Sequence, residues 1–270
     1  MRAIIFLCFL LFQLHSKERI IAMSPAISEI LFGLGLGDQV VGVSDYATFP
    51  KEVQNLPKIG GYFHPSLEKI IALKPTLVVT NQHESKIAKQ LEDFGLQTLQ
   101  LELSTLDNIK ASIEKLALHT KVSSKPLITS IDKALKKAQS KKPSKTPRVL
   151  VIYGLSHDLS GGIYIAGHKI FFEDIITACG GSNAFEKNFI GQPVLNYESL
   201  IVTNPDIVIL LHNKLTDKED RKSIESLWSK VPVKASLDKQ IHILDAEYIS
   251  LPSHRVASTI NDICKVIHAY

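Results

Sequence analysis

The feature that most constrains this chain is an alternation of short apolar segments with helix-like segments along most of its 270 residues. An apolar segment such as RVLVIY (148–153) suits a strand buried on both faces, whereas apolar residues at 27, 30, 31 and 34 share one face of a helix. Strands are predicted at 19–23, 39–43, 76–80, 97–101, 148–153, 206–211 and 240–244, and helices at 27–34, 66–73, 84–94, 169–178, 217–229 and 253–268. This alternation predicts an α/β protein whose parallel sheets are covered on both faces.

One segment of the first half is repeated in the second half. Residues 66–80 (SLEKIIALKPTLVVT) align without gaps on residues 196–210 (NYESLIVTNPDIVIL), which places Glu68 on Glu198. Each copy has a polar residue that can cap a helix, then an acid, a short helix, a proline break and an apolar strand. A unit that occurs once in each half predicts two similar α/β lobes.

The segment 106–142 separates the two halves and has a helical pattern. Apolar residues recur at helical spacing from Ile109 to Leu135, and Pro143 ends the pattern, so two helices are predicted, the second a long one at about 122–142. The predicted division is a first lobe at 17–121, an interlobe helix and linker at 122–147 and a second lobe at 148–270. The lysines near the end of the long helix suit either a solvated helix end, where positive charge is favourable, or a patch for an anionic partner.

The first 16 residues have the pattern of a secretory signal peptide. Arg2 is followed by an apolar run from Ala3 to Phe12, which is too short for a helix that crosses about 30 Å of hydrocarbon. Cleavage after Ser16 would remove Cys8, one of the three cysteines, and the alternative is an uncleaved anchor. A secreted chain would meet an oxidising compartment, and we expect it in the periplasm.

Composition and motifs exclude several classes of function. A formal net charge of +4 gives no electrostatic reason to expect nucleic acid as a partner. The sequence lacks a glycine-rich dinucleotide motif after a strand, a P-loop, a GxSxG motif and an HExxH motif, and it has no structural zinc spacing. A two-lobed α/β chain without these motifs suggests a protein that holds a ligand between its lobes, beyond the carboxyl ends of the strands, and is not an enzyme.

Several stretches occur together in an order that points to a known family. They are RIIAMSPAISEILFGLGLGDQVVGVSD (19–45), Gly60-Gly61, the segment 66–79 and IAGHKIFFEDIITACGGSNAF (165–185), followed by the segment around Glu198. These stretches resemble the substrate-binding proteins of metal-chelate ABC importers, which bind cobalamin, haem or siderophores. The resemblance implies two Rossmann-like lobes with parallel sheets, joined by one long backbone helix. It also implies that a chelate is held between the lobes and delivered to a membrane permease.

The resemblance gives roles to two acids and two cysteines. In the cobalamin-binding branch a glutamate on each lobe docks on permease arginines, and Glu68 and Glu198 match those positions. Each acid also follows a predicted helix cap, where negative charge stabilises the helix start, and both roles can hold together. In the same branch a cysteine before the second-lobe Gly-Gly pairs with one in the last helix, which here implies a disulfide between Cys179 and Cys264. The alternative is two buried free thiols.

Ligand-binding residues in the family come from loops that follow strands. In this chain the candidates in such loops are Tyr46, Tyr62, Phe63, His64, His83, Tyr248, His254 and Arg255. Aromatic faces pack on a flat macrocycle, and an imidazole or phenolate ligates iron, cobalt or nickel. His64 is the metal-ligand candidate because it directly precedes a predicted helix start. Arg255 would either neutralise an acidic group of the ligand, cap a strand end or form an ion pair between the lobes.

The function that we expect is that of a monomeric periplasmic binding protein for a metal chelate, with an ABC permease as partner and no cofactor of its own. A corrinoid fits the order of motifs best. Cobalamin-binding relatives place tryptophans in the loops at 61–64 and 81–83, where this chain has none, its single tryptophan being Trp228, and this leaves room for haem, a siderophore or a smaller metal complex. Two alternatives remain open at this point. One is direct capture of a free nickel, zinc or manganese ion by His64, His83 and a second-lobe histidine, and the other is an enzyme of unrecognised type.

Overall fold

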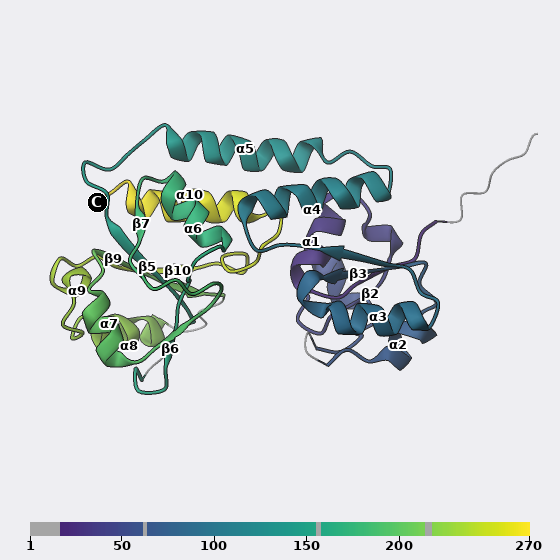
Figure 1. Ribbon diagram of the computed structural model, residues 1–270, viewed down its shortest axis with the longest axis horizontal. Helices are drawn as coiled ribbons and strands as arrows, with labels where there is room; N and C mark the ends of the chain where they lie inside the picture. Colours follow the sequence, from purple (N-terminus) through teal and green to yellow (C-terminus); the bar gives the residue numbers. More distant parts are fainter. Residues whose placement is uncertain (1–16, 62–63, 155–157, 214–217) are drawn as a thin grey trace, which may run out of the picture.

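The computed structural model describes residues 17–61, 64–154, 158–213 and 218–270, which form two lobes bridged along one side by helices (Figure 1). The first lobe contains a parallel sheet of strand order β2-β1-β3-β4. Its strands are β1 (Ile20–Ala22), β2 (Val40–Val43), β3 (Leu77–Asn81) and β4 (Thr98–Leu101). Its helices are α1 (Pro25–Gly33), α2 (Leu67–Ala72), α3 (Ser85–Asp93) and α4 (Leu106–His119), with short 3₁₀ turns at Gly37–Gln39, Lys51–Asn55 and Gln82–Glu84.

The second lobe repeats this architecture with a parallel sheet of order β10-β9-β5-β7. A small antiparallel pair, β6 (Ile163–Tyr164) with β8 (Val194–Leu195), is added to it. The sheet strands are β5 (Arg148–Tyr153), β7 (Ser182–Asn183), β9 (Ile207–His212) and β10 (Ile241–Asp245). The helices are α6 (Phe171–Ala178), α7 (Tyr197–Thr203), α8 (Lys218–Trp228), α9 (Lys234–Leu237) and α10 (Val256–Ile267).

The repeated sequence unit adopts the same local structure in both lobes. Helix α2 is followed by Lys74 with a φ of 47° and then by β3, and helix α7 is followed by Asn204 with a φ of 42° and then by β9. The carbonyl of Lys74 accepts a hydrogen bond from Arg19, and the carbonyl of Asn204 accepts one from Arg148. The predicted pair of similar lobes is therefore confirmed, and an arginine bonded to the end of the helix is a further feature that the two lobes share.

Helix α5 (Lys125–Gln139) lies along the bridged side of the molecule and packs mainly against α10 (Figure 1). Its buried residues Ile131, Ala134 and Ala138 belong to a core cluster that includes residues of both lobes. The fold class predicted from the sequence, two parallel-sheet lobes joined by a backbone helix, is confirmed. Among the described helices, none has both the length and the apolar composition that a membrane span requires.

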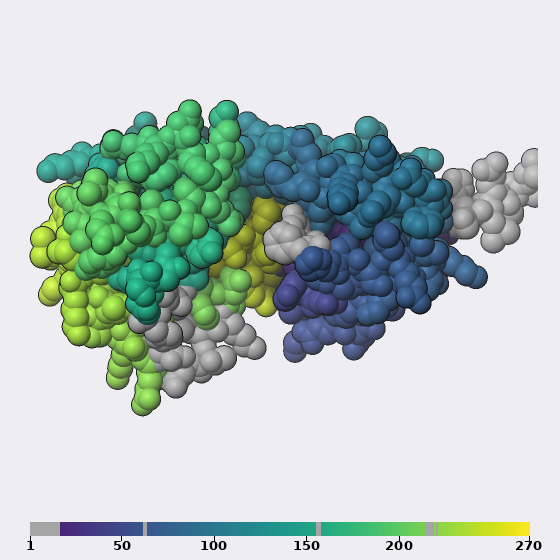
Figure 2. Space-filling model, turned by 60° about the horizontal axis from the view of Figure 1, so that its bottom comes forward, coloured from purple at the N-terminus to yellow at the C-terminus, as the bar shows by residue number. Residues whose placement is uncertain are grey.

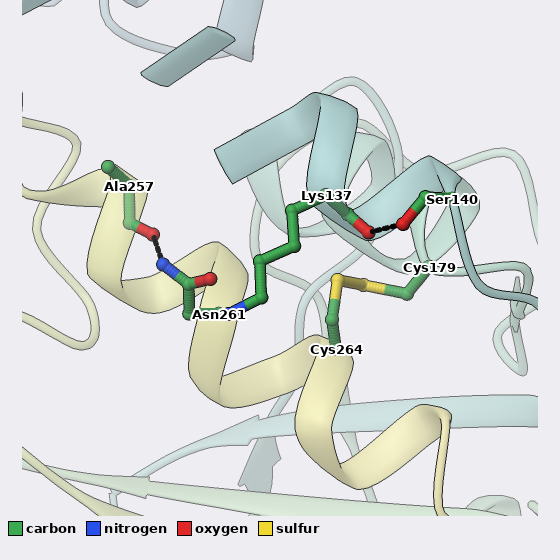
Figure 3. Close-up of a disulfide and its surroundings, with 6 residues drawn as sticks. All are labelled: Lys137, Ser140, Cys179, Ala257, Asn261 and Cys264. Carbon is green, nitrogen blue, oxygen red and sulfur yellow. Dashed lines mark hydrogen bonds between the residues drawn. A yellow bond between two sulfur atoms is a disulfide. The ribbon is translucent and has the colours of Figure 1, made fainter. Parts of the chain in front are cut away.

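The disulfide between Cys179 and Cys264 is present, with the two Cα atoms 5.1 Å apart. It joins the end of α6 to α10, next to the end of α5, where Lys137 and the capping residue Ser140 lie (Figure 3). Both cysteines are buried, so the bridge lies within the helical layer of the second lobe. The alternative of two free thiols is thereby excluded.

Candidate ligand cleft

A cavity of about 420 Å³ lies between the two lobes at the carboxyl ends of β3, β4 and β5. Figure 2 shows the space between the lobes from its open side. The first lobe contributes residues that follow or end β3 and β4, namely Asn81, Gln82, His83, Leu101, Glu102, Leu103 and Ser104. The second lobe contributes Tyr153, Ile170, Phe171, Gly191, Gln192, Ser250 and Pro252. The position is the one where open parallel sheets bind ligands.

The described lining of this cavity is rich in neutral hydrogen-bonding groups. Amides come from Asn81, Gln82 and Gln192, and hydroxyls come from serines of both lobes. Burial raises the pKa of the Tyr153 phenol, which hydrogen-bonds to Gln192, so this group stays neutral. Glu102 is the carboxylate of the described lining, in which no lysine or arginine is present.

The floor of the cavity is built by contacts between the lobes. The Phe171 backbone N–H donates to the carbonyl of Ser104 over 2.6 Å. The Leu106 backbone N–H donates to the Asp174 carboxylate over 2.8 Å, which joins the start of α4 to α6. The ring centroids of Phe171 and Phe172 lie 4.2 Å apart, so an aromatic pair supports this floor.

The predicted first-lobe residues lie in different places. His83 is exposed and lines the cavity. Tyr46 and His64 are also exposed, Tyr46 to 68%, but neither is among the residues that line it. Tyr62 and Phe63 lie outside the described residues. The structure thus brings one of the predicted first-lobe residues, His83, to the cleft wall.

The predicted second-lobe residues Tyr248, His254 and Arg255 lie in the segment between β10 and α10 that also carries the cavity residues Ser250 and Pro252. The Tyr248 hydroxyl donates to the carboxylate of Asp262 over 2.8 Å. The role that the structure shows for Arg255 is an ion pair between the lobes, described below. These three side chains are not part of the described cavity lining.

His254 is neutral at physiological pH because burial, with a smaller contribution from the nearby Arg255 charge, lowers its pKa to about 4. Its imidazole packs on Gly33 of α1, and its Nδ1 is buried without a hydrogen-bond partner in the structure. A neutral, packed ring at this point serves the contact between the lobes.

Sequence reasoning missed two buried acids, Glu29 and Glu84. Glu84 directly follows the cavity residues 81–83, and its carboxylate accepts the backbone N–H of Asn81 over 2.7 Å. Burial raises the pKa of Glu84 to about 7, and its second oxygen has no partner in the structure. Glu29 is 2% exposed within α1 and binds Arg255. Neither has a sequence signal, because an acid in a helical or loop pattern is usually exposed.

Glu68 and Glu198 are exposed in the first turns of α2 and α7. Ser66 and Asn196 cap the two helices, as the repeat predicted, through bonds from the backbone N–H groups of Lys69 and Ser199. Helices α2 and α7 both lie on the side of the molecule away from α5 (Figure 1). One partner surface on that side could contact both lobes.

No group of three or more His, Cys, Asp or Glu side chains in the described part of the chain is placed to hold a metal ion. His64 and His83 therefore do not form a metal centre with a described histidine of the second lobe. Capture of a free metal ion, the alternative expectation, is not favoured.

Comparison with known proteins decides the family. The model of the periplasmic binding protein family matches residues 20–247. The chain belongs to this family. A vitamin B12-binding protein of Vibrio campbellii is 28% identical over 256 residues, which cover 92% of this periplasmic binding protein and 88% of that relative. An uncharacterized ABC transporter substrate-binding lipoprotein of Bacillus subtilis is 28% identical over 264 residues, 93% of this chain and 80% of the relative.

Solved structures show the same fold. The periplasmic haem-binding protein RhuT from Roseiflexus is 24% identical, with a TM-score of 0.76 over 94% of this chain and 98% of that structure. The periplasmic vitamin B12-binding protein BtuF of Vibrio cholerae is 22% identical, with a TM-score of 0.77 over 93% of this chain and 97% of that structure. These structures show the fold, and the family and the curated relatives show the role: this periplasmic binding protein is a substrate-binding component of transport and not an enzyme.

Proposed function

We propose that this protein captures a corrinoid in the cleft between its lobes and delivers it to the permease of an ABC importer in the inner membrane. The chain would reach the periplasm through the signal peptide predicted at residues 1–16 and act as a monomer. Support comes from the family and from relatives named as vitamin B12-binding proteins. The observation that carries the choice of ligand is the chemistry of the cleft wall.

The wall suits a ligand with amides on its periphery. Asn81, Gln82 and Gln192 offer donors and acceptors, which match the neutral amide side chains of a corrinoid. Haem and many ferric siderophores carry negative charge, and a carboxylate that is buried without a cation is costly. The described lining supplies Glu102 and no lysine or arginine, so it favours the neutral periphery.

Arg255, one of whose expected roles was to neutralise an acidic ligand group, already has two carboxylate partners. Its guanidinium pairs with Glu29 over 3.0 Å and with Glu247 over 2.8 Å. Releasing it for a ligand would leave the Glu29 carboxylate buried without its cation. This supports a ligand that needs no arginine.

His83 is the side chain that we propose as an axial ligand to the metal of the chelate. It lines the cavity and is exposed, so its imidazole is accessible to a bound macrocycle. Neutral imidazole is a good ligand for cobalt and iron. His64 is the matched control, because it is exposed on the same lobe and does not belong to the described lining.

A ligand panel tests the choice of corrinoid. Isothermal titration calorimetry with cyanocobalamin, haemin and a ferric siderophore should show cyanocobalamin bound at least about tenfold more tightly than the other two. The visible spectrum of aquocobalamin should shift when it binds to the wild-type protein. Loss of this shift in His83→Ala, but not in His64→Ala, would support the axial role. Tighter binding of haemin than of cyanocobalamin would overturn the corrinoid proposal.

Permease docking is tested by reversing the charge of both exposed acids. We propose that Glu68 and Glu198 pair with permease arginines, which bind carboxylates through two parallel hydrogen bonds. The double variant Glu68→Arg with Glu198→Arg should lose transport and keep the affinity for cyanocobalamin. The control Glu52→Arg with Glu114→Arg makes the same charge change at exposed positions outside α2 and α7 and should keep transport. Transport by the first double variant would contradict the docking role.

A further inference from the structure

The segment 246–255, here termed the strap, joins β10 to α10 and packs against the first lobe. It begins beside the second sheet, where the Ala246 N–H donates to the carbonyl of His212 over 3.0 Å. Ile249 of the strap is fully buried, and Ser250 and Pro252 line the ligand cavity. Figure 2 shows the last part of the chain, in yellow, between the two lobes. The strap is therefore both a wall of the cleft and a contact between the lobes.

The strap is fastened to α1 through a buried carboxylate. Glu29 of α1 is 2% exposed and receives the Arg255 guanidinium on one oxygen over 3.0 Å. Its other oxygen accepts the hydroxyl of Ser253, which is fully buried. The Ser253 oxygen accepts the Arg255 backbone N–H over 3.1 Å, so the three groups form a closed network.

The Arg255 guanidinium lies against aromatic rings from both lobes. Its central carbon is 3.8 Å from the ring centroid of Phe49 in the first lobe and 4.9 Å from that of Tyr248 in the strap. A second nitrogen of the guanidinium binds Glu247 of the strap over 2.8 Å. A planar cation that stacks and forms directed bonds at once is held in one orientation.

A close steric contact lies beside this network. A Cβ atom added to Gly33, on the same helix as Glu29, would come within 2.8 Å of the His254 ring. The strap thus approaches α1 too closely for a side chain at position 33. This contact offers a way to displace the strap without touching the ion pair.

We propose that Glu29 and Arg255 are positioning residues for the ligand, because their contact fastens the strap to the first lobe and thereby sets the width of the cleft. The chain itself passes between the lobes along the side bridged by α4 and α5 (Figure 1). The peptide connection and the hydrogen bond between Phe171 and Ser104 already hold the two lobes together. The strap is a second, non-covalent fastening between them. Loosening it moves Ser250 and Pro252 away from the opposite wall. The inference rests on the proposed function, since it takes this cavity as the ligand site.

The test combines a ligand-independent and a ligand-dependent measurement on Glu29→Gln, which keeps the shape of the side chain and removes its charge. Hydrogen exchange measured by mass spectrometry should show faster exchange in peptides that cover 246–255 and unchanged exchange in β1, β3, β5 and β9. Stopped-flow measurements with cyanocobalamin should show dissociation about tenfold faster, association changed less than about twofold, and an unchanged binding stoichiometry. A merely structural role would instead reduce the fraction of protein that binds.

Two further variants make the result interpretable. Gly33→Ala, which displaces the strap sterically, should reproduce both effects even if Glu29→Gln is poorly folded. Glu186→Gln breaks an Arg–Glu pair of the same 3.0 Å length, that of Arg148 with Glu186 within the second lobe, and should change neither measurement.

The outcomes separate this inference from the proposed function. Unchanged exchange of the strap in both Glu29→Gln and Gly33→Ala overturns the inference. Faster exchange with an unchanged dissociation rate also overturns it, because the strap would then not control the cleft. If the wild-type protein does not bind cyanocobalamin, the corrinoid proposal fails. The inference is then decided by hydrogen exchange in the two variants: peptides around 81–84, across the cleft, should exchange faster together with the strap, and unchanged exchange there overturns it.

Discussion

In the first lobe the sheet has the order β2-β1-β3-β4, and in the second lobe the corresponding strands have the order β7-β5-β9-β10. Helices α1 and α6 follow the first strand of each lobe, and α4 and α10 follow the last. The lobes differ in what holds these two helices. In the second lobe Cys179 at the end of α6 is bonded to Cys264 of α10, whereas the corresponding capping residue of α1 is the buried Leu34.

The first lobe is instead tied to its neighbour. Helix α1 carries Glu29, whose partners Ser253 and Arg255 come from the strap of the second lobe. A covalent bond makes the second lobe rigid within itself, while a set of polar contacts fixes the first lobe relative to it. Together with the role proposed for the strap, the difference assigns the second lobe as a fixed frame and the first lobe as the body whose position the polar contacts set.

Removal of the disulfide should have the largest effect on this comparison. The bridge spans 85 residues, and closing such a loop is worth about 4.6 kcal/mol in the chain-entropy model. Cys179→Ala with Cys264→Ala should therefore lower the free energy of unfolding by up to about this amount. Trp228, buried in the second lobe, reports the loss in a urea titration followed by fluorescence. An unchanged midpoint would show that the bridge does not stabilise the second lobe.

A change of pH should have a smaller effect on the free energy of unfolding, and it should act through Glu84 of the first lobe. Since burial raises the pKa of Glu84 to about 7, the folded state holds a proton there that the unfolded state releases near the ordinary glutamate pKa of 4.5. The contribution of Glu84 to stability is thus greatest at low pH and falls as pH rises from about 4.5 to about 7, by at most about 3 kcal/mol.

Glu84→Gln imitates the protonated carboxyl and should remove this slope. The variant should match the wild type in urea unfolding at pH 4.5 and be more stable than the wild type at pH 8. Parallel stability curves for the two proteins across that range would contradict a buried, protonated Glu84.

The smallest effect tests whether the repeated units are equivalent. Ser66 and Asn196 each accept a backbone N–H bond at a helix start, over 3.3 and 2.8 Å. Ser66→Ala and Asn196→Ala should each cost about 1 kcal/mol in the free energy of unfolding, with the shorter bond of Asn196 giving the larger loss. A cost in one lobe and none in the other would show that the two units share a fold and not an energetic role.

Much of this architecture could be predicted because it repeats and because it is local. Strand β5 was predicted at its observed bounds, and the aligned segments around Glu68 and Glu198 predicted α2 and α7. The disulfide came from the family resemblance, since spacing alone does not pair cysteines. The strands β6, β7 and β8 were missed because each is two residues long and has no periodicity to detect.

The cleft was predicted less well, because it depends on contacts between distant segments. His83 was found because it follows a strand, and Glu102 and Gln192 were not singled out among many polar loop residues. Arg255 was expected as a ligand residue or an ion-pair partner, and only the fold shows that Glu29, 226 positions away, faces it. No local pattern identifies a pair so far apart.

Helix α5 precedes the exposed linker at 140–146 in the sequence, but in the structure it packs on α10 of the second lobe. The division of the chain into lobes thus differs from the division of the folded molecule. A protease that cuts the linker would therefore leave a first fragment that keeps one of its helices embedded in the second. The two pieces should therefore stay together after the peptide bond is lost, held by the packing of α5 on α10.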